Sequence, residues 1–474
     1  MRKYLWVVLA MIATLGIMST GCEKEVSVTV DVYPDSNLEE TFASIEPGTT
    51  VIFHEGEYKQ FELDSKVSGT KKNPVKFAVA EGEKVVVKPE DRGVDEEGYP
   101  VDSYGIHVVN ADNITIDGFE IQGGTHGVYY ESTPEYGDTA LENVTISNCT
   151  VHGIRGVHGI CVYARNDLAP VKNLTMDGCT VYDCECDSSE STVFNGNIDG
   201  FIISNNVIHD NNNIGIDMIG FEGNAKHTDE KFDNPYDADY VRNGKCYGNV
   251  VYNISAEGNQ AYYEDGEYDL CADGIYVDGG QKIEIYNNFV FSCNIGIEIA
   301  TEHSPDDNEL FKVSDIDVHD NIVGDCQGWC GLCFGGYDVD LGFTENCKFH
   351  NNTFIDNGTQ VGVQRSSGNR IYDNLFVDGD SAIEFNSDCK EGDLINDFGE
   401  NAWCLAGDSD ILDWSDAGDY DISNLLPQAA VDKQKIILDR AEAIDGFKSL
   451  IGGVGSTFVP SDEYIKLYKS VVSK

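Results

Sequence analysis

The sequence predicts an all-β fold: a single-stranded, right-handed parallel β-helix solenoid with helical end caps and loop insertions on one side. Three observations predict it. A short phrase recurs along most of the chain, a strictly alternating segment lies between its copies, and a column of asparagines follows it. The composition agrees, because 49 Gly and only 11 Pro among 474 residues suit short strands joined by tight turns.

The recurring phrase appears as NITIDGF from Asn113, NVTISNC from Asn143 and NLTMDGC from Asn173, and shorter copies continue beyond them. The sixth position of each copy is Gly, Asn or Asp, residues that suit a turn. These turn positions are Gly118, Asn148, Gly178, Asn205, Gly248, Asn287, Asp320, Asn351 and Asp373. A unit of about 22 to 30 residues that tolerates insertions is typical of one solenoid coil.

A second phrase lies between the turn positions and alternates after a small residue, as in IGIDMIG from Ile214 and DGIYVDG from Asp273. A period of two is typical of a strand with one buried face. The side chains predicted to point inward are Ile216, Met218, Ile275, Val277, Ile297 and Ile299. Those predicted to point outward are Asp217, Tyr276, Asp278 and Glu298.

Six of the residues that directly follow the turn positions are asparagines: Asn206, Asn249, Asn288, Asn321, Asn352 and Asn374. In register they would form a ladder in which each side-chain amide bonds the next. With these motifs the chain resembles the pectate-lyase-like family of right-handed parallel β-helix proteins, over roughly residues 40 to 400. The resemblance implies enzymes that act on polysaccharides. The right hand also follows from the usual hand of parallel crossovers.

The N-terminus has the pattern of an export signal. Arg2 and Lys3 precede an apolar stretch, Tyr4–Met18, that is too short to span a membrane comfortably. Small residues and then Cys22 follow, which resembles a bacterial lipoprotein signal in which Cys22 is lipidated; Ser19 stands where such signals prefer Leu. An ordinary secretory signal is the alternative. Either way we expect an exported bacterial protein at the cell surface or in the periplasm.

The ends of the solenoid need covers. The segment Thr41–Lys59 predicts a cap helix that leads into the first strands, and residues 428–450 have the periodicity of a capping helix. The predicted organisation is a signal peptide over residues 1–22, a tether over 23–36, the β-helix over 37–400 and a C-terminal capping region over 401–474.

Fourteen cysteines remain besides Cys22. Export favours disulfides. Two pairs, however, fall at equivalent positions of neighbouring coils, Cys149 with Cys179 and Cys293 with Cys326, where small buried free thiols also fit. The sequence leaves both states open.

Three long insertions, at about residues 221–243, 256–272 and 301–313, flank the same stretch of the alternating strands. Long loops on a regular scaffold usually build a binding cleft. The insertions are rich in tyrosine, which suits either the apolar face of a sugar ring or the packing of the loops themselves.

Beside these loops we expect Asp217, Asp278 and Glu298 on neighbouring strands, at diagonals of roughly 8 Å between backbones. Two carboxyl groups about 5 to 9.5 Å apart are what glycoside hydrolysis requires, and crowding of like charges keeps one of them protonated. These three residues are therefore the candidate catalytic groups. The candidates for substrate binding are Tyr276, Glu302, His303 and His158.

The same acids are compatible with other interpretations. They could form a solvated acidic face, or a Ca²⁺ site for which Asp199, Asp217 and Asp273 are the candidate ligands. No other cofactor is indicated. Lyases of the resembling family typically use Lys or Arg as the base, often with Ca²⁺, and here only Lys226, Arg242 and Lys245 are candidates.

The net charge of −52 disfavours nucleic acid, anionic lipid and polyanionic substrates. We therefore expect a glycoside hydrolase that acts on a neutral or weakly charged polysaccharide or oligosaccharide, and contact with a membrane only through the lipid anchor. A calcium-dependent polysaccharide lyase and a non-catalytic glycan-binding or adhesive protein are the alternatives.

Overall fold

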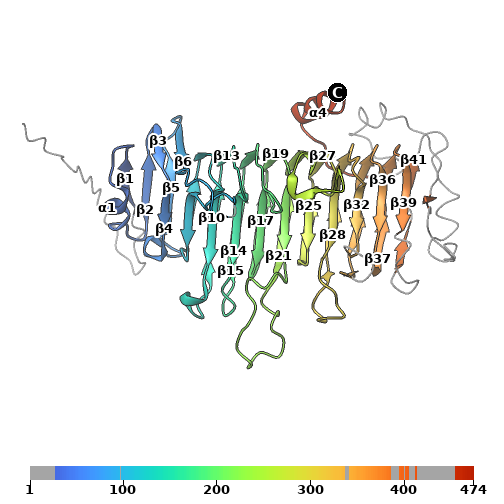
Figure 1. Cartoon of the computed structure of the whole chain (residues 1–474), viewed down its shortest axis with the longest axis horizontal. Coiled ribbons are helices and arrows are strands. Elements are labelled where there is room, and N and C mark those ends of the chain that lie inside the picture. Colours follow the sequence, from blue (N-terminus) through green and yellow to red (C-terminus); the bar gives the residue numbers. More distant parts are fainter. Residues whose placement is uncertain are drawn as a thin grey trace, which may run out of the picture.

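The computed structural model describes residues 27–96, 98–336, 341–385, 394–399, 401–404, 412–413 and 454–473. It is an elongated stack of coils in which the strands lie across the long axis and are stacked side by side along it (Figure 1). Each complete coil contributes one strand to each of three parallel sheets. We call them A, B and C in chain order, and the recurring phrase forms the strand of sheet A. This confirms the predicted fold class.

The three sheets contain every described strand except the hairpin of β23 (Tyr263–Glu264) and β24 (Glu267–Tyr268). Sheet A consists of β1 (Val28–Val32), β2 (Thr49–Phe53), β5 (Val75–Val79), β8 (Ile114–Asp117), β11 (Leu141–Glu142), β12 (Val144–Ser147), β15 (Val171–Asp177), β18 (Ile198–Ser204), β21 (Val241–Tyr247), β26 (Gln281–Tyr286), β29 (Val313–Ser314), β30 (Asp317–His319), β33 (Thr344–Glu345), β34 (Lys348–His350), β37 (Ser366–Tyr372) and β40 (Leu394–Phe398).

Sheet B consists of β3 (Gly56–Lys59), β6 (Val85–Lys88), β9 (Glu120–Gln122), β13 (Thr150–His152), β16 (Thr180–Tyr182), β19 (Val207–Asn211), β22 (Val250–Ile254), β27 (Phe289–Cys293), β31 (Ile322–Gly324), β35 (Thr353–Ile355), β38 (Leu375–Val377) and β41 (Ala402–Cys404). Sheet C consists of β4 (Phe61–Leu63), β7 (Tyr104–Val109), β10 (His126–Ser132), β14 (His158–Ala164), β17 (Thr192–Gly196), β20 (Ile216–Ile219), β25 (Asp273–Asp278), β28 (Ile295–Ala300), β32 (Cys330–Phe334), β36 (Thr359–Val363), β39 (Ser381–Phe385) and β42 (Leu412–Asp413).

The turn from sheet A to sheet B explains the recurring phrase. All nine predicted turn positions have a positive φ, for example +86° at Gly118, +51° at Asn148 and +53° at Asp320. Only Gly, and less readily Asn or Asp, adopts this left-handed conformation at low cost. The chain bends from sheet A to sheet B within one residue at this corner, so the residue type is restricted in every coil.

The predicted asparagine ladder is confirmed. From Asn206 to Asn374 each side-chain amide donates to the side-chain oxygen of the next asparagine at 2.9–3.0 Å. The ladder extends one coil further, to Asn401. The same amides also donate to backbone carbonyls, as Asn288 does to that of Cys246. Buried turn backbone is thereby hydrogen-bonded coil after coil.

The interior is filled by the inward side chains of the alternating strands. The six residues predicted to point inward are all fully buried, and they belong to one continuous core. The twelve cysteines described with their side chains are free thiols. Eleven of them are buried, as the interpretation as small buried thiols predicts, and Cys271 is partly exposed.

The ends differ in part from the prediction. Residues Val28–Val32, assigned to the tether, form β1 and pair with β2, because their alternating Val side chains extend sheet A. The N-terminal helix is a single turn, α1 (Leu38–Phe42), capped by Asn37, and lies slightly earlier than predicted. The predicted capping helix over 428–450, the signal peptide and Cys22 lie outside the described residues.

The described residues include three short 3₁₀ turns, η1 (Ser65–Val67), η2 (Pro134–Tyr136) and η3 (Gln260–Tyr262). The C-terminal helix α4 (Asp462–Val471) lies on the outside of sheet B, above β27 in Figure 1. Its Tyr468 is buried against Phe289 and Phe291, so it covers a face of the solenoid rather than an end. None of the helices in the described ranges is long and apolar enough to cross a membrane.

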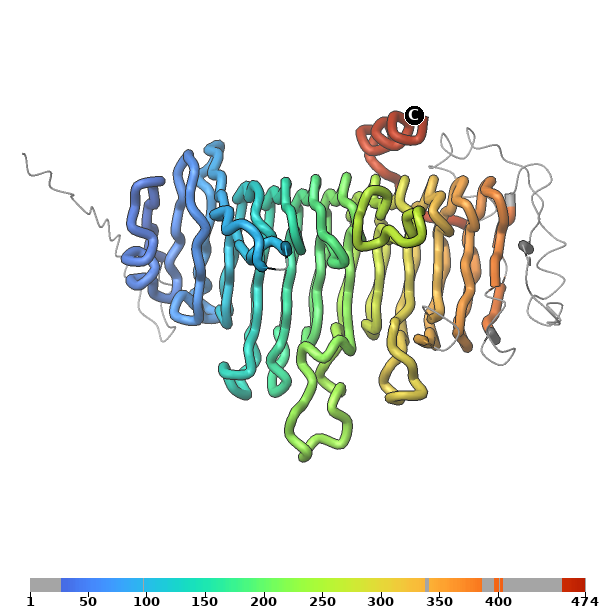
Figure 2. Tube along the Cα trace, viewed as in Figure 1, coloured from blue at the N-terminus to red at the C-terminus, as the bar shows by residue number. Residues whose placement is uncertain are grey.

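The three predicted insertions are present, but they lie at both edges of sheet C and not on one side, as predicted. Residues 221–240 and 301–312 form the two longest loops at the lower edge in Figure 2, after β20 and β28. Residues 256–272 lie between β22 and β25, at the opposite edge. The central strands of sheet C are therefore flanked by loops from two directions.

Candidate functional site: a buried carboxylate cluster on sheet C

The outer face of sheet C carries a group of acids between β17 and β28. We call Glu190, Asp217, Asp273, Asp278, Glu298 and Glu302 the carboxylate cluster. Asp217, Tyr276 and Glu298 are register partners on successive strands β20, β25 and β28, so they form one column. Asp278 pairs with Ala300, two residues beyond Glu298 on the adjacent strand. This register agrees with the predicted diagonal of roughly 8 Å.

A local irregularity places Asp273 in the same group. A Cβ on Gly274 would lie 2.5 Å from Cγ1 of Val290 in the interior, so only glycine fits there. The residue before it, Asp273, points outward and shares a hydrogen bond with Glu298. Glu298 also bonds Cys333.

The cluster is buried, contrary to the solvated face that was one interpretation of the sequence. Asp217 is 2 %, Asp278 5 % and Glu298 8 % exposed. Burial raises the pKa of all three, and neighbouring carboxylates add to the shift. The pKa of Glu298 is raised to about 7, mainly by burial. Carboxyl groups that hold protons near neutral pH are therefore concentrated here.

Two of the insertions form a cover beside the cluster. Nε2 of His303 lies 3.0 Å from Oε1 of Glu222, which raises the pKa of His303. The side-chain amides of Asn234 and Asn308 bond each other at 2.8 and 3.0 Å. Below this cover, the backbone N–H of Glu302 donates to Oδ1 of Asp278 at 3.3 Å. The two loops are thus joined by a few polar contacts directly above Asp278.

Aromatic residues in the same loops mostly pack the cover together. Phe311 contacts Phe221 and Tyr236, and Tyr240 contacts Phe221. In the third insertion, the hydroxyl of Tyr262 accepts from Asn213, and Tyr263 stacks on Tyr268 within its own hairpin. Of the two roles left open for these rings, packing is the one that the contacts show.

Two buried oxygens in the cluster have no hydrogen-bond partner: Oδ1 of Asp217 and Oδ1 of Asp273. A buried polar atom without a partner is costly, by about 1–3 kcal/mol. Within the part of the chain that the structure describes, each of these oxygens can therefore accept a hydrogen bond from a substrate hydroxyl or coordinate a cation. The oxygen-rich donor set fits a hard cation such as Ca²⁺.

Two predicted site residues are not part of this group. Asp199 lies on β18 in sheet A, where it faces Arg242 at 3.8 Å and accepts from Asn243 at 2.6 Å. It belongs to a different sheet from Asp217 and Asp273, so the predicted three-residue calcium set is wrong. His158 is 1 % exposed, and its ring nitrogens bond the carbonyl of Glu190 and the hydroxyl of Tyr163. Its predicted contact with substrate is not supported, because the ring is buried beneath the surface of the sheet.

Sequence reasoning missed Glu190 and Glu222. Glu190 occupies the place of His158 one coil later, and burial raises its pKa to about 7. The signal was present, because Glu190 precedes a small residue, Ser191, as His158 precedes Gly159. Glu222 lies in an insertion without a repeat, so only the folded loop shows that it meets His303.

Parallel coils, a turn residue with positive φ in each coil and a stacked asparagine column are the features of a right-handed parallel β-helix protein. Two family profiles match: "Right handed beta helix region" over residues 101–265 and "Periplasmic copper-binding protein (NosD)" over residues 232–415. The uncharacterized protein YwoF of Bacillus subtilis (strain 168) is 31 % identical over 411 residues, which cover 83 % of this chain and 81 % of that protein. The chain belongs to the same family of right-handed β-helix proteins as YwoF.

Solved structures share the architecture at low similarity. The mannuronan C-5 epimerase AlgE4 A-module of Azotobacter vinelandii has 18 % identity and a TM-score of 0.43, over 77 % of this chain and 89 % of that one. The GH136 lacto-N-biosidase of Eubacterium ramulus has 12 % and 0.47, over 81 % and 67 %. Pectate lyase Pel9A has 13 % and 0.38, over 80 % and 81 %. These likenesses concern the fold alone.

Proposed function

We propose that the protein is a glycoside hydrolase whose catalytic pair is drawn from the carboxylate cluster. The observation that carries the proposal is the placement of Asp278 and Glu298, one coil and two residues apart, on one buried face. Carboxyl groups in that range of separation can protonate a glycosidic oxygen on one side and attack, or activate water, on the other. Burial supplies the second requirement, because it keeps one of the two protonated.

The environments of the two residues suggest their roles. Glu298 has its pKa raised to about 7 by burial and is the general acid, since it holds a proton near neutral pH. Burial and the neighbouring Glu302 and Glu222 raise the pKa of Asp278 as well, so a proton must leave it before it reacts. The hydrogen bonds from the backbone of Glu302 and from Thr301, and the charge of His303, oppose this rise. We assign Asp278 as the nucleophile or the base because of these opposing contacts. The unpaired oxygen of Asp217 receives a sugar hydroxyl.

Access requires the cover to move. Asp278 and Glu298 are both less than a tenth exposed, so a sugar ring reaches them only if residues 221–240 and 301–312 part. Polar contacts, His303 with Glu222 and Asn234 with Asn308, join these loops and can be exchanged for water. The packing of Phe311 against Phe221 and Tyr236 also joins them, so opening of the cover exposes these aromatic rings as well. Closure over a bound ring would exclude water from the reacting bond.

The basic residues favour hydrolysis over elimination. Lys226 contacts the ring and hydroxyl of Tyr236, Arg242 bonds the carbonyl of Tyr240 and the side chain of Asn197, and Lys245 pairs with Glu284. Arg242 and Lys245 lie on sheet A. Each has a partner, and none is directed to the cluster by a described contact.

The test is glycan cleavage by the purified chain carrying Cys22→Ser, on a panel of neutral and uronic polysaccharides, with and without a calcium chelator. New reducing ends without ultraviolet absorbance of an unsaturated product, abolished in Asp278→Asn and Glu298→Gln, are the expected result. Calcium-dependent absorbance would replace the proposal with a lyase. Retention of glycan on the protein without cleavage would replace it with a binding function.

We also propose that the protein is exported and held to a membrane by lipid at Cys22. The periplasmic description of the matching family supports export, and the residues before Cys22 support the anchor. Detergent-phase partitioning of the protein from its host, lost in Cys22→Ser, is the expected result. Partitioning that is unchanged in this variant would contradict the anchor.

A further inference from the structure

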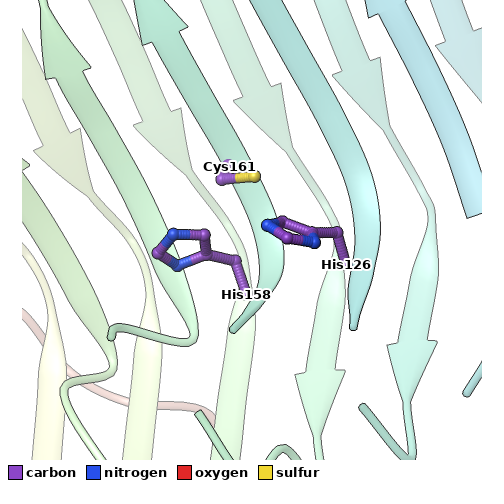
Figure 3. Close-up of side chains that lie close together, drawn as sticks. All are labelled: His126, His158 and Cys161. Carbon is purple, nitrogen blue, oxygen red and sulfur yellow. The ribbon is translucent and has the colours of Figure 1, made fainter. Parts of the chain in front are cut away.

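A second group of side chains lies on the outer face of sheet C, in earlier coils than the carboxylate cluster. His126 begins β10, and His158 and Cys161 lie on the next strand of the sheet, β14. One donor atom from each of the three lies within 4.8 Å of the other two. Figure 3 shows the two imidazole rings and the sulfur gathered over these adjacent strands.

The fold places these donors by the same irregularity that turns Asp273 to the outer face of sheet C. A Cβ on Gly159 would lie 2.5 Å from Cγ1 of Val181 in the core. His158, directly before it, therefore points outward, and Cys161 three residues later points to the same side, in the column of Tyr129. His126 pairs with His158 in the register, so the two rings face each other across adjacent coils at 5.5 Å between centroids.

Each ring is oriented from its Nδ1 side. Nδ1 of His126 lies 2.9 Å from the hydroxyl of Thr125, and Nδ1 of His158 lies 2.8 Å from the carbonyl oxygen of Glu190. Histidines that bind metals are held in this way, with one ring nitrogen bonded to an oxygen and the other directed at the ion. Nε2 of His126 makes no hydrogen bond within the described part of the chain, and Nε2 of His158 meets only the hydroxyl of Tyr163, at 2.9 Å.

Burial determines which ion these donors suit. His126 is 7 %, His158 1 % and Cys161 0 % exposed. Two neutral imidazoles and one thiolate carry a single negative charge. A monovalent ion makes this donor set neutral, and the carboxylate of Glu190, 3.7 Å from Nδ1 of His158, lies outside the donor set. Thiolate and imidazole are also donors that copper prefers, and three donors with no fourth in place are fewer than structural zinc normally takes.

We propose that His126, His158 and Cys161 form a three-coordinate site for monovalent copper. On binding, an S–Cu bond replaces the S–H bond of Cys161, and the proton leaves to solvent; the metal keeps its oxidation state. The hydroxyl of Tyr163 gives up its hydrogen bond to Nε2 of His158 and turns away.

The site is independent of the proposed hydrolase and of the family description. The profile described as copper-binding matches residues 232–415, and all three donors precede that range. The carboxylate cluster offers hard oxygen donors, which suit copper poorly. The carbonyl of Glu190 connects the two groups, because it holds His158 while its side chain belongs to the cluster.

The experiment measures copper on the whole purified chain under anaerobic conditions. Cu⁺ is titrated against a chromogenic Cu⁺ chelator to obtain stoichiometry and affinity, and X-ray absorption at the copper edge counts sulfur and nitrogen neighbours. We expect one tightly held equivalent with one sulfur and two nitrogen neighbours. Coordination by sulfur alone would overturn the proposal, because it would place the ion among the other buried thiols.

Variants locate the ion. Cys161→Ser and His126→Gln should each weaken this equivalent by more than about 100-fold, since even an outer hydrogen bond is worth about 10–100-fold. Cys246→Ser is the matched control: its thiol is fully buried and touches no histidine, and serine can still accept from Asn249. Unchanged binding in Cys161→Ser would overturn the proposal. If Cys161→Ser loses its circular dichroism spectrum, His126→Gln and the absorption spectrum of the native chain decide.

Tyr163→Phe separates a metal site from a structural histidine pair. It removes the hydroxyl that competes for Nε2 of His158, so copper affinity should stay equal or increase. A loss of affinity would show that Tyr163 itself holds the ion and that the proposed donor set is wrong. Tighter binding of Zn²⁺ than of Cu⁺ in the same titration would also overturn the assignment.

Discussion

The outer face of sheet C changes its chemistry halfway along one continuous backbone. The earlier strands, β7 to β14, present imidazole, phenol and thiol groups such as His107, Tyr129 and Cys161. The later strands, β20 to β28, present the carboxyl groups of Asp217 and Glu298 in the same column. The coils therefore determine the position of each side chain on the face, whereas the residue type determines the chemistry at that position.

The interior changes at nearly the same place. The column after the left-handed turn contains Phe119, Cys149 and Cys179 in the earlier coils, and asparagines from Asn206 onward. The change is made without a break, because Oδ1 of Asn206 accepts from the backbone N–H of Cys179. The later coils, which carry the acids and the longest insertions, are thus the ones with a hydrogen-bonded interior column.

The largest effect on the rate of glycan cleavage is expected from replacing the candidate catalytic acids of the later strands. Asp278→Asn and Glu298→Gln should each reduce glycan cleavage by about 10²–10⁴-fold, because each removes one proton-transfer or attacking group. Tyr129→Phe, in the same outer column of the earlier strands, is the matched control and should leave the rate unchanged. Equal losses in the control would mean that the two regions act as one site, contrary to the proposal.

The second largest effect is expected in stability, where substitutions in the two parts of the interior column should differ. Asn288→Ala removes a side chain that bonds both ladder neighbours and the carbonyl of Cys246, and should lower the free energy of unfolding by about 3 kcal/mol. Cys149→Ala, at the equivalent position of an earlier coil, removes mainly packing and should cost about 1 kcal/mol. Guanidinium unfolding followed by circular dichroism measures both. A larger loss for Cys149→Ala would refute the structural importance of the ladder.

Joining the two loops of the cover should reduce the rate of cleavage by a smaller factor. Joining Asn234→Cys to Asn308→Cys with a short bifunctional thiol reagent should reduce cleavage at least about tenfold, because the loops can no longer part to admit a glycan. Each single variant treated with the same reagent serves as its control. Full activity in the joined protein would show that substrate enters by another route.

The smallest effect is expected in the pH dependence of stability, which should differ between Glu298 of the cluster and an acid outside it. The pKa of Glu298 is about 7 in the folded protein and near 4.5 in the unfolded chain, so the folded state holds the extra proton between these values. The stability from this proton is present below about pH 4.5 and is lost as the pH rises through about 7. Glu298→Gln should therefore gain about 1–3 kcal/mol over the native protein between about pH 5 and pH 8.

Thermal unfolding of both proteins across that range measures the difference. Asp199→Asn, an acid on sheet A outside the cluster, is the control and should show no such gain. A gap between Glu298→Gln and the native protein that stays constant with pH would mean that Glu298 is ionised throughout.

Much of the fold was predictable because a solenoid repeats its constraints. The turn position admits only Gly, Asn or Asp in each coil, and the next position repeats Asn, so single letters recur in register. The candidate acids Asp217, Asp278 and Glu298 were predictable for the same reason, since period-two alternation assigns a face to every residue. The ends were less so: β1 is a strand only because β2 offers it an edge to pair with.

The solenoid, the ladder and the alternation that places Asp278 and Glu298 on one face follow from the amino-acid sequence, because these features depend on neighbours at a fixed spacing along the chain. The burial of the acids, the contact of Glu222 with His303 and the position of Asp199 on another sheet became evident only in the folded chain. Folding also brought His126, His158 and Cys161 within 4.8 Å of one another. Such contacts depend on how insertions fold back and how coils stack, and no local pattern encodes them.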